Sequence, residues 1–355
     1  MLNNNFRNII GLDISDLKIR FVQMSNRFSK KPTIKSFGEV DVPPNLIING
    51  EIMNKNVVIE LVKRLLEHPI SGKVENQFVN ASLPENKVFL KLISIPKVTE
   101  QEMMGAVAWG VEQNFPMAID QLYFDWYKIN DQNTEKTKKI QVLVSAAPKY
   151  LVDIYTEIIE KAGFITIGLE NESIAIARCL INQSFNTDEP LLIIDLGKSR
   201  TNIMIYHNES IIFTNSLNIN GTEMTKMVAK EIKLSFDDAE KAKKICGLDK
   251  RKGRGAVRKI LIPIIDNLVD KILETMDYFD RYYASHKKIS NIILTGSVSR
   301  MSGLTEYLNE KLNLSVIIGN SLINLNTKRK WPPDFKKMDF LSFSTAIGLS
   351  LKDIR

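Results

Sequence analysis

Two segments about half a chain apart share one pattern of hydrophobic and polar positions. Leu191–Ile194 is apolar, Asp195 ends the run, and Ile203–Tyr206 is apolar again after a short polar turn. Near the N-terminus, the apolar run Ile9–Leu12 leads into Asp13, and another apolar stretch follows a second polar turn. Each pattern predicts two buried strands joined by a hairpin. The repetition predicts two related lobes that each contribute one hairpin to a shared cleft.

Most of the remaining chain alternates between strand and helix periodicity. Apolar alternation predicts strands at 31–43, 77–84, 87–96, 121–129, 139–148 and 210–221. Helical spacing predicts helices at 57–66, 149–164, 172–182, 222–232, 235–247, 256–284 and 340–354. The segment 291–320 predicts a strand, a glycine turn, a helix and a further strand. Strands that alternate with helices indicate an α/β fold with mostly covered sheets.

The stretch from about 88 to 148 has its own pattern and predicts a small βαββ unit inserted into the first lobe. Thr99 and Glu102 have the spacing of a capping box at the start of a helix, and Pro116 ends that helix. We expect its apolar face to consist of Met104, Val107, Ala108, Val111 and Phe115.

Composition narrows the class of protein. The chain has 355 residues, of which 25% are charged and 44% apolar, as in ordinary globular proteins with room for two lobes. No apolar run approaches the roughly 20 residues that span a bilayer, and the N-terminus lacks a signal-peptide layout. The two cysteines, Cys179 and Cys246, are too few for a disulfide framework or a metal site. We therefore expect a cytoplasmic protein.

The net charge of +7 permits an acidic partner without identifying one. Two basic clusters, 250–259 and 328–337, carry much of this charge. Solvated loops are the simpler interpretation, and contact with an anionic membrane surface is the alternative. The cluster 250–259 contains no aromatic side chain that could serve as a stacking platform, and we do not expect a nucleic-acid partner.

Three features have residue types that suit a magnesium-phosphate group, a flat ligand and ribose hydroxyls, respectively. An aspartate at a strand end, beside backbone amides and small hydroxyls, suits a magnesium-phosphate group, and both Asp13 and Asp195 have this setting. The turn at Gly296 allows backbone to approach a flat ligand closely. Glu240 and Lys243 share one helical face and suit ribose hydroxyls, although an ordinary surface ion pair would have the same spacing.

Taken in order, these elements resemble a known family. The stretches "IIGLDISDLKIRFVQ", "ESIAIAR", "LLIIDLGKSRTNIMI", "SFDDAEKAKKICGL" and "STAIGLSL" follow the layout of the actin-like ATPase superfamily. Within it, the chain resembles the type IV pilus assembly protein PilM family along nearly its whole length. The resemblance rests on the order of the motifs across the chain and not on one motif. It implies an actin-like fold, related to that of the division protein FtsA, which binds ATP with Mg²⁺ between two lobes.

The resemblance also implies a division of the chain. The first lobe would comprise 1–87 with phosphate loop 1, 149–188 up to the hinge, and the C-terminal helix at 338–355. The second lobe would comprise 189–222 with phosphate loop 2, a helical subdomain at 223–289, and 290–337 with the adenine-side turn. The inserted subdomain would be 88–148.

Roles for individual residues follow from the same resemblance. Asp13 and Asp195 would hold magnesium through water molecules. The two phosphate loops would contribute Asp13, Ser15 and Arg20, and Asp195, Gly197, Lys198 and Thr201. The rest of the nucleotide would lie against Gly221, Thr222 and Glu223, the ribose pair Glu240 and Lys243, and the adenine-side residues Gly296 and Ser297. Glu172 would orient the attacking water, although Glu170 is equally near in sequence.

Three departures from the family pattern affect the expected activity. Ser15 and Asn220 stand where glycines are usual, and Ser297-Val298 replaces further glycines at the adenine-side turn. If Ser15 adopted a left-handed conformation, the strain would be about 1–2 kcal/mol. We therefore expect at most a slow ATPase.

The resemblance implies a role in the pilus assembly platform at the inner face of the cytoplasmic membrane. The expected partner is the N-terminal cytoplasmic peptide of a PilN-like membrane protein, together with other platform proteins, and self-association stays open. The candidate peptide anchors on the inserted subdomain are Trp109, Phe115, Tyr123 and Trp126, and packing in the core of that subdomain is the alternative for each of them. Two alternatives are an FtsA-like filament-forming protein and a small-molecule kinase of the same fold. The kinase alternative requires an aspartate base that faces an acceptor pocket, and the sequence has no such residue in an evident substrate loop.

Overall fold

The computed structural model describes residues 8–25, 31–129, 139–182, 189–282, 287–327, 334–335 and 338–352. Residues 130–138, between the last two predicted strands of the insert, and most of the basic cluster 328–337 lie outside these ranges.

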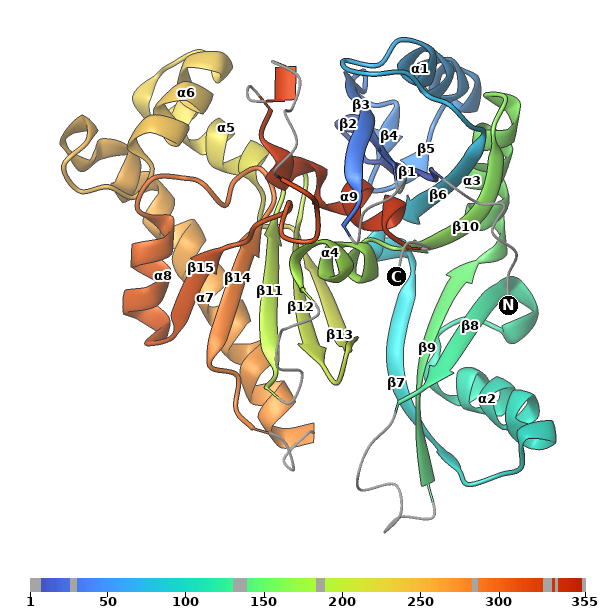
Figure 1. Ribbon diagram of the computed structural model, residues 1–355. Helices are drawn as coiled ribbons and strands as arrows, with labels where there is room; N and C mark the ends of the chain where they lie inside the picture. The colour runs from blue at the N-terminus through green and yellow to red at the C-terminus, as the bar shows by residue number, and fades with distance from the viewer. Residues whose placement is uncertain are drawn as a thin grey trace.

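Two five-stranded sheets of the same design form the two lobes (Figure 1). The first has the order β10-β6-β1-β2-β3 and the second β13-β12-β11-β14-β15. The strands of the first are β1 (Ile10–Ile14), β2 (Lys18–Ser25), β3 (Thr33–Asp41), β6 (Phe78–Leu83) and β10 (Ile165–Asn171). The strands of the second are β11 (Leu191–Leu196), β12 (Thr201–His207), β13 (Ser210–Leu217), β14 (Asn291–Thr295) and β15 (Ser315–Ile318).

The pairing within the two sheets is equivalent, strand for strand. In each sheet a central strand, β1 or β11, pairs antiparallel with the next strand along the chain and parallel with a later one. The register sets Asp13 opposite Arg20 in the first sheet and Asp195 opposite Asn202 in the second. The predicted duplication is therefore present, and it places both aspartates at matching positions near the carboxyl ends of central strands.

Helices cover the sheets and separate the lobes (Figure 1). On the first sheet, the core contains side chains of α1 (Lys55–Glu67) and α3 (Lys149–Lys161). On the second, the core contains side chains of α5 (Gly221–Ile232), α6 (Phe236–Cys246), α7 (Ala256–Tyr282) and α8 (Leu304–Leu312). A third core between the two sheets contains side chains of α4 (Glu172–Leu180) and α9 (Ser344–Ser350).

Close backbone packing fixes the two central helices. A Cβ atom added to Gly348 would lie 1.8 Å from the carbonyl oxygen of Ala175, and one added to Gly11 would lie 2.0 Å from that of Ala346. Glycine is therefore required where α9 packs on α4 and on β1. Helix α9 thus lies beside the first strand, between the lobes.

The inserted segment folds against its own core. It contains β7 (Phe89–Pro96), α2 (Glu100–Asn114), β8 (Leu122–Lys128) and β9 (Lys139–Pro148), with the strands in the order β7-β9-β8. Glu102 accepts the backbone N–H of Thr99 at 3.1 Å, as the capping-box spacing predicts. The expected apolar face needs one correction, because Met103 is buried whereas Met104 is 59% exposed.

The sequence patterns missed three strands. β10 forms one edge of the first sheet, and the short strands β4 (Ile47–Ile48) and β5 (Glu51–Ile52) form a separate two-stranded sheet. The residues of β10 are mostly half-buried, so they lack the clear alternation of a strand with one wet face. Two-residue strands are too short to produce a periodic pattern.

Candidate functional site

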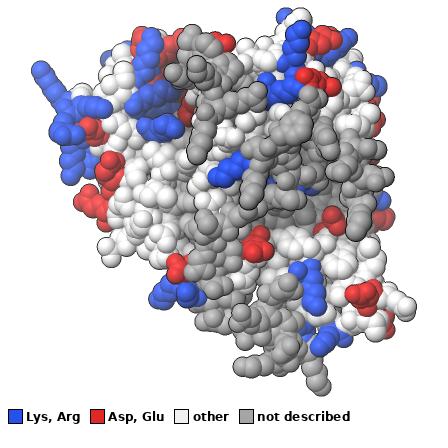
Figure 2. Space-filling view, viewed as in Figure 1, with Lys and Arg blue, Asp and Glu red and all other residues white. Residues whose placement is uncertain are grey.

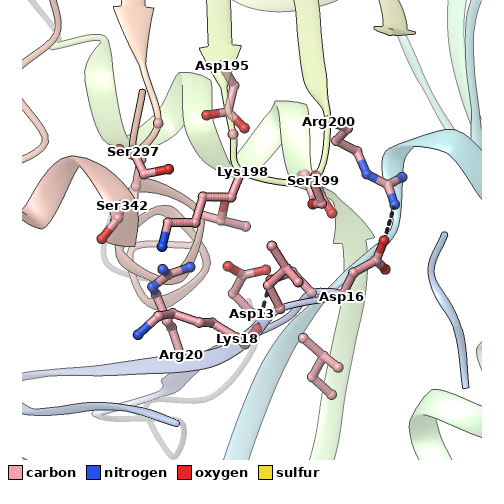
Figure 3. Close-up of a pocket in the computed structure, with 18 of the residues that line it drawn as sticks. Asp13, Asp16, Lys18, Arg20, Asp195, Lys198, Ser199, Arg200, Ser297 and Ser342 are labelled. Carbon is pink, nitrogen blue, oxygen red and sulfur yellow. Dashed lines mark hydrogen bonds and ion pairs between the residues drawn. The ribbon is translucent and has the colours of Figure 1, made fainter. Parts of the chain in front are cut away.

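A cavity lies between the two lobes, where the β1–β2 turn faces the β11–β12 turn (Figure 3). Its walls also include Glu172 at the start of α4, the turn after β14, and residues of the segment 341–345. The predicted site residues that line it are Asp13, Ser15, Arg20, Glu172, Asp195, Gly197, Lys198, Gly296 and Ser297. Gly50 and Pro84 complete the lining, so residues from seven separate parts of the chain meet at one cavity.

The two aspartates face this cavity from opposite lobes. The hydroxyl of Ser82, on the neighbouring parallel strand, donates a hydrogen bond of 3.1 Å to Asp13 Oδ1. Asp195 lies against the turn after β14, where a Cβ atom added to Gly296 would come within 2.4 Å of its Oδ1. Gly296 has φ +85°, which an L-residue adopts only with strain. This position therefore needs glycine for two independent reasons.

Neither of the turn residues Gly197 and Ser15 adopts the left-handed conformation. Gly197 does not have a positive φ; instead, a Cβ atom there would lie 2.7 Å from the Arg200 carbonyl oxygen, which accepts the Gly197 N–H at 2.9 Å. Ser15 also has no positive φ, so the left-handed strain considered for it is absent. Its hydroxyl donates to the carbonyl oxygen of Lys18 at 2.8 Å.

Three carboxyl groups of the cavity have raised pKa values. Burial is the main cause for Asp195, and the nearby charge of Asp13 adds to it, which together raise the pKa of Asp195 to about 7. Burial also raises the pKa of Asp13, against the opposing effect of Arg20. Burial and the charge of Asp13 raise the pKa of Glu172 well above its usual range. A cluster of desolvated, mutually repelling carboxyl groups is stabilised when a cation binds among them.

Basic side chains line the same cavity. Figure 3 shows Lys18, Arg20 and Lys198 around it, with the two lysines on opposite lobes. Arg20 Nε donates to Glu39 at 3.0 Å, and Lys18 Nζ lies 2.6 Å from the same carboxylate. This shared contact orients both cations at the edge of the cavity.

An ion pair that the sequence analysis missed joins the two turns. Asp16 Oδ2 lies 3.2 Å from Arg200 Nη2, and each side chain is 13% exposed. Asp16 also accepts the backbone N–H groups of Asn49 at 3.1 Å and Gly50 at 2.8 Å, while Arg200 contacts Asn86. The pair links the two lobes across the cavity (Figure 3). The signal for this ion pair in the sequence was Asp16, a second acidic residue within the first turn.

Glu172 and Glu170 have different surroundings. Glu170 forms an ion pair with Arg178 at 2.5 Å and does not line the cavity. Glu172 lines it, and Asn202 Nδ2 donates to its Oε2 at 3.2 Å. Of the two glutamates that the sequence left open, only Glu172 therefore reaches the site.

Six predicted site residues lie outside the cavity lining: Thr201, Gly221, Thr222, Glu223, Glu240 and Lys243. Thr201 is buried and donates to the carbonyl of Ile219 at 2.6 Å. Lys243 is also buried; its Nζ lies 2.6 Å from Glu240 and donates to the Gly221 carbonyl at 2.8 Å. Glu240 and Lys243, the expected ribose-contacting pair, thus contact each other and the start of α5. Although burial opposes ionisation, the hydrogen bonds from Lys243 and Thr225 lower the pKa of Glu240 to about 2.

The start of α5 nevertheless contacts the second turn directly. The N–H of Gly221 donates to the carbonyl of Gly197 at 3.0 Å, and that of Thr222 to the carbonyl of Lys198 at 3.0 Å. Val298 fills the space beside Gly221, where an added Cβ atom would lie 2.6 Å from its Cγ2. Glu240 and Lys243 therefore lie next to the cavity but do not line it.

The inserted subdomain offers a different kind of surface. Phe115 is buried in the core of the insert and Trp126 packs against that core, whereas Trp109 is 57% and Tyr123 48% exposed. Tyr123 lies near the start of α3, where Lys149 Nζ is 5.4 Å from its ring centroid. Tyr123 is thus an exposed candidate anchor at the junction with the first lobe.

The described residues contain neither a ready-made cluster of metal ligands nor a membrane-spanning helix. Within these ranges, no three histidine, cysteine, aspartate or glutamate side chains gather closely enough to ligate a metal ion by themselves. The same ranges contain no helix with both the length and the apolar content to cross a bilayer.

The chain is similar to proteins of known family and fold. A family model described as type IV pilus assembly protein PilM matches residues 11–354. A chain of the PilM-PilN type IV pilus biogenesis complex is similar with a TM-score of 0.81 and 21% identity, covering 98% of this chain and 99% of that one. MreB5 of Spiroplasma citri bound to AMPPNP is similar with a TM-score of 0.54 and 14% identity, covering 90% and 95%.

Among curated proteins, the cell division protein FtsA of Neisseria meningitidis serogroup B is 26% identical over 207 residues. That alignment covers 51% of this chain and 48% of FtsA, so the chain spans about half the length of this curated relative. The family match over nearly the whole chain is stronger evidence of family membership than this partial alignment. The chain belongs to the type IV pilus assembly protein PilM family and has the two-lobed actin-like ATPase fold.

Proposed function

We propose that this protein is an Mg-ATP-binding component of the type IV pilus assembly platform, held at the membrane by the cytoplasmic N-terminal peptide of a PilN-like protein. The observation that carries the nucleotide part is the convergence of Asp13 and Asp195, from equivalent strand ends of two lobes, on one cavity that is also lined by cations. A solved structure with the same fold carries AMPPNP, an ATP analogue.

The residues present fit a magnesium-phosphate group. Asp13 and Asp195 would hold the ion through water molecules. Lys18 and Lys198 would contact phosphate oxygens from opposite sides. Bound magnesium would neutralise phosphate charge and polarise the γ-phosphoryl group. Glu172, whose raised pKa suits a proton acceptor, would orient the attacking water.

We expect turnover to be slow. Ser15 and Asn220 replace residues that are glycine in the family pattern. The ribose pair Glu240 and Lys243 is engaged within the protein, so nucleotide binding requires these contacts to rearrange. Both features favour a nucleotide-responsive scaffold over an efficient enzyme.

Calorimetry with Mg-ATP tests the nucleotide part. The Asp195→Ala variant should lose binding while keeping its fold, and the exposed Asp153→Ala variant on α3 is the matched control. Unchanged affinity of the Asp195→Ala variant would remove the cavity assignment. Equal loss in the control would show that any charge removal weakens binding and would also contradict it.

The peptide part rests on the junction of the insert and the first lobe. Within the described sheet, β8 is an edge strand that pairs only with β9. Tyr123 belongs to this strand, and the exposed Tyr150 of α3 directly follows Lys149, whose Nζ is 5.4 Å from the Tyr123 ring centroid. An extended peptide could pair with this edge through main-chain hydrogen bonds and bury the tyrosine rings. The PilM-PilN complex supports a PilN-like partner for this chain.

Fluorescence anisotropy with a labelled PilN-like N-terminal peptide tests this surface. Tyr123→Ser should weaken binding at least tenfold, about 1.4 kcal/mol, whereas Tyr282→Ser, which removes an exposed tyrosine on α7, should not. A stronger variant removes residues 89–146; Phe89 pairs with Ala146, so the cut ends lie side by side. Full peptide binding by that folded variant would place the partner site elsewhere.

A further inference from the structure

The second lobe carries a concentrated basic surface that the nucleotide cavity does not use. Residues 221–259 contain twelve lysines and arginines and six acidic residues, so this stretch carries +6 of the net charge of +7. Figure 2 shows lysine and arginine side chains gathered where α6 and the loop after it lie in Figure 1. This concentration of positive charge favours an anionic partner.

Hydrogen bonds within the loop after α6 and to the turn before α8 hold this loop in place. The N–H of Leu248 donates to the carbonyl of Ser302 at 2.7 Å, and the N–H of Gly255 donates to that of Lys252 at 3.0 Å. Arg254 adopts the left-handed conformation with φ 51°, which a non-glycine residue keeps only where its surroundings fix it. The loop therefore presents its cations in a set geometry.

An apolar side chain lies beside these cations. Ile245, in the last turn of α6, is 62% exposed. The loop folds back toward it, because a Cβ atom added to Gly253 would lie 3.1 Å from Sγ of the adjacent Cys246. The exposed basic residues around it are Lys241, Lys244, Lys250, Arg251, Lys252 and Arg254. Only Arg251 among the four loop cations pairs with an acid within the loop, Asp249, at 3.3 Å.

We propose that this surface, formed by the end of α6 and residues 249–255, docks on an anionic lipid bilayer. Cations contact lipid phosphates while an exposed apolar side chain enters the headgroup region, and both parts are present here. Nucleic acid fits less well, because this surface offers an isoleucine and no aromatic ring for base stacking. The proposal is independent of ATP and of the PilN-like peptide.

Co-sedimentation of the full chain with lipid vesicles tests the proposal. The protein should bind vesicles containing phosphatidylglycerol, bind phosphatidylcholine vesicles far less, and release as salt rises. The variant Lys250→Gln, Arg251→Gln, Lys252→Gln, Arg254→Asn should lower binding by about 100-fold or more, because each cation contributes about fivefold. Asparagine is chosen at position 254 because it tolerates a positive φ. Ile245→Ser alone should lower binding severalfold.

The matched control removes four exposed cations elsewhere: Lys63→Gln, Arg64→Gln, Lys97→Gln and Lys128→Gln. It should retain most vesicle binding, and both variants should keep the wild-type circular dichroism and melting profile. Equal binding to neutral vesicles, equal loss in the control, or undiminished binding by the loop variant would each overturn the proposal. Binding to duplex DNA without binding to anionic vesicles would also overturn it, in favour of a nucleic-acid partner.

Discussion

Replacing Asp195 with asparagine should stabilise the nucleotide-free protein while weakening its hold on Mg-ATP. Burial and the charge of Asp13 raise the pKa of Asp195 from 3.8 to about 7. The folded protein therefore binds more protons than the unfolded chain between these two values, so its stability falls as pH rises through that window. Above about pH 7 the full cost of the ionised carboxylate is present. The Asp195→Asn variant lacks that charge.

The difference in pKa corresponds to at most about 4 kcal/mol of unfolding free energy. Because Asp195 faces the cavity and water there screens its charge, we expect about 1–3 kcal/mol. At pH 8 this should raise the Tm by about 2 °C or more. The gain should shrink as the pH is lowered to 5.5, because wild-type Asp195 takes up its proton over that range.

Differential scanning calorimetry across this pH range, paired with Mg-ATP titration, measures both effects. The expected result combines a higher Tm without nucleotide with weaker Mg-ATP binding, as for a charge held in place to bind a cation. A lower Tm at pH 8, or a Tm gain that does not depend on pH, would refute the electrostatic reasoning. Asp153→Asn, on the exposed side of α3, should change neither quantity.

Three further predictions concern other parts of the molecule. Gly296→Ala should lower the unfolding free energy by at least about 1–2 kcal/mol and abolish Mg-ATP binding, because the added methyl meets Asp195 at a positive φ; Gly105→Ala on α2, with nothing within 4 Å, should raise it by about 0.5–1 kcal/mol in the same melts. Steady ATP hydrolysis should stay far below about 10 per second, and a rate near that value would contradict a scaffold role. Glu172→Gln should lower the residual rate without lowering Mg-ATP affinity, and an equal loss of affinity would argue for a binding role instead.

The arrangement of the lobes could be predicted from the sequence because it depends on local patterns. Two apolar–Asp–polar–apolar hairpins indicated a duplicated design, and the equivalent pairing of β1 with β2 and β11 with β12 agrees with it. The helical spacing near the insert also predicted α2, but not its rotation, since Met103 and Met104 are both apolar and only the packing selects one.

The parts of the site that arise from long-range contacts could not be predicted. Asp16 and Arg200 meet across 184 positions of sequence, and no local pattern links them. The segment 341–345 reaches the cavity only because α9 returns between the lobes. Conversely, the motif containing Glu240 and Lys243 is read easily in sequence, yet the pair closes on Thr225 and Gly221. Whether a motif faces a cavity or its own helix depends on packing.

The most direct test of the proposed nucleotide site is an experimental structure determined with Mg-AMPPNP. The account predicts that the phosphates lie between the turns at 13–20 and 195–201, with magnesium near both Asp13 and Asp195. It also predicts that Glu240 and Lys243 have released at least one of their present contacts. Nucleotide bound outside this cavity, or no bound nucleotide at saturating concentration, would contradict the account.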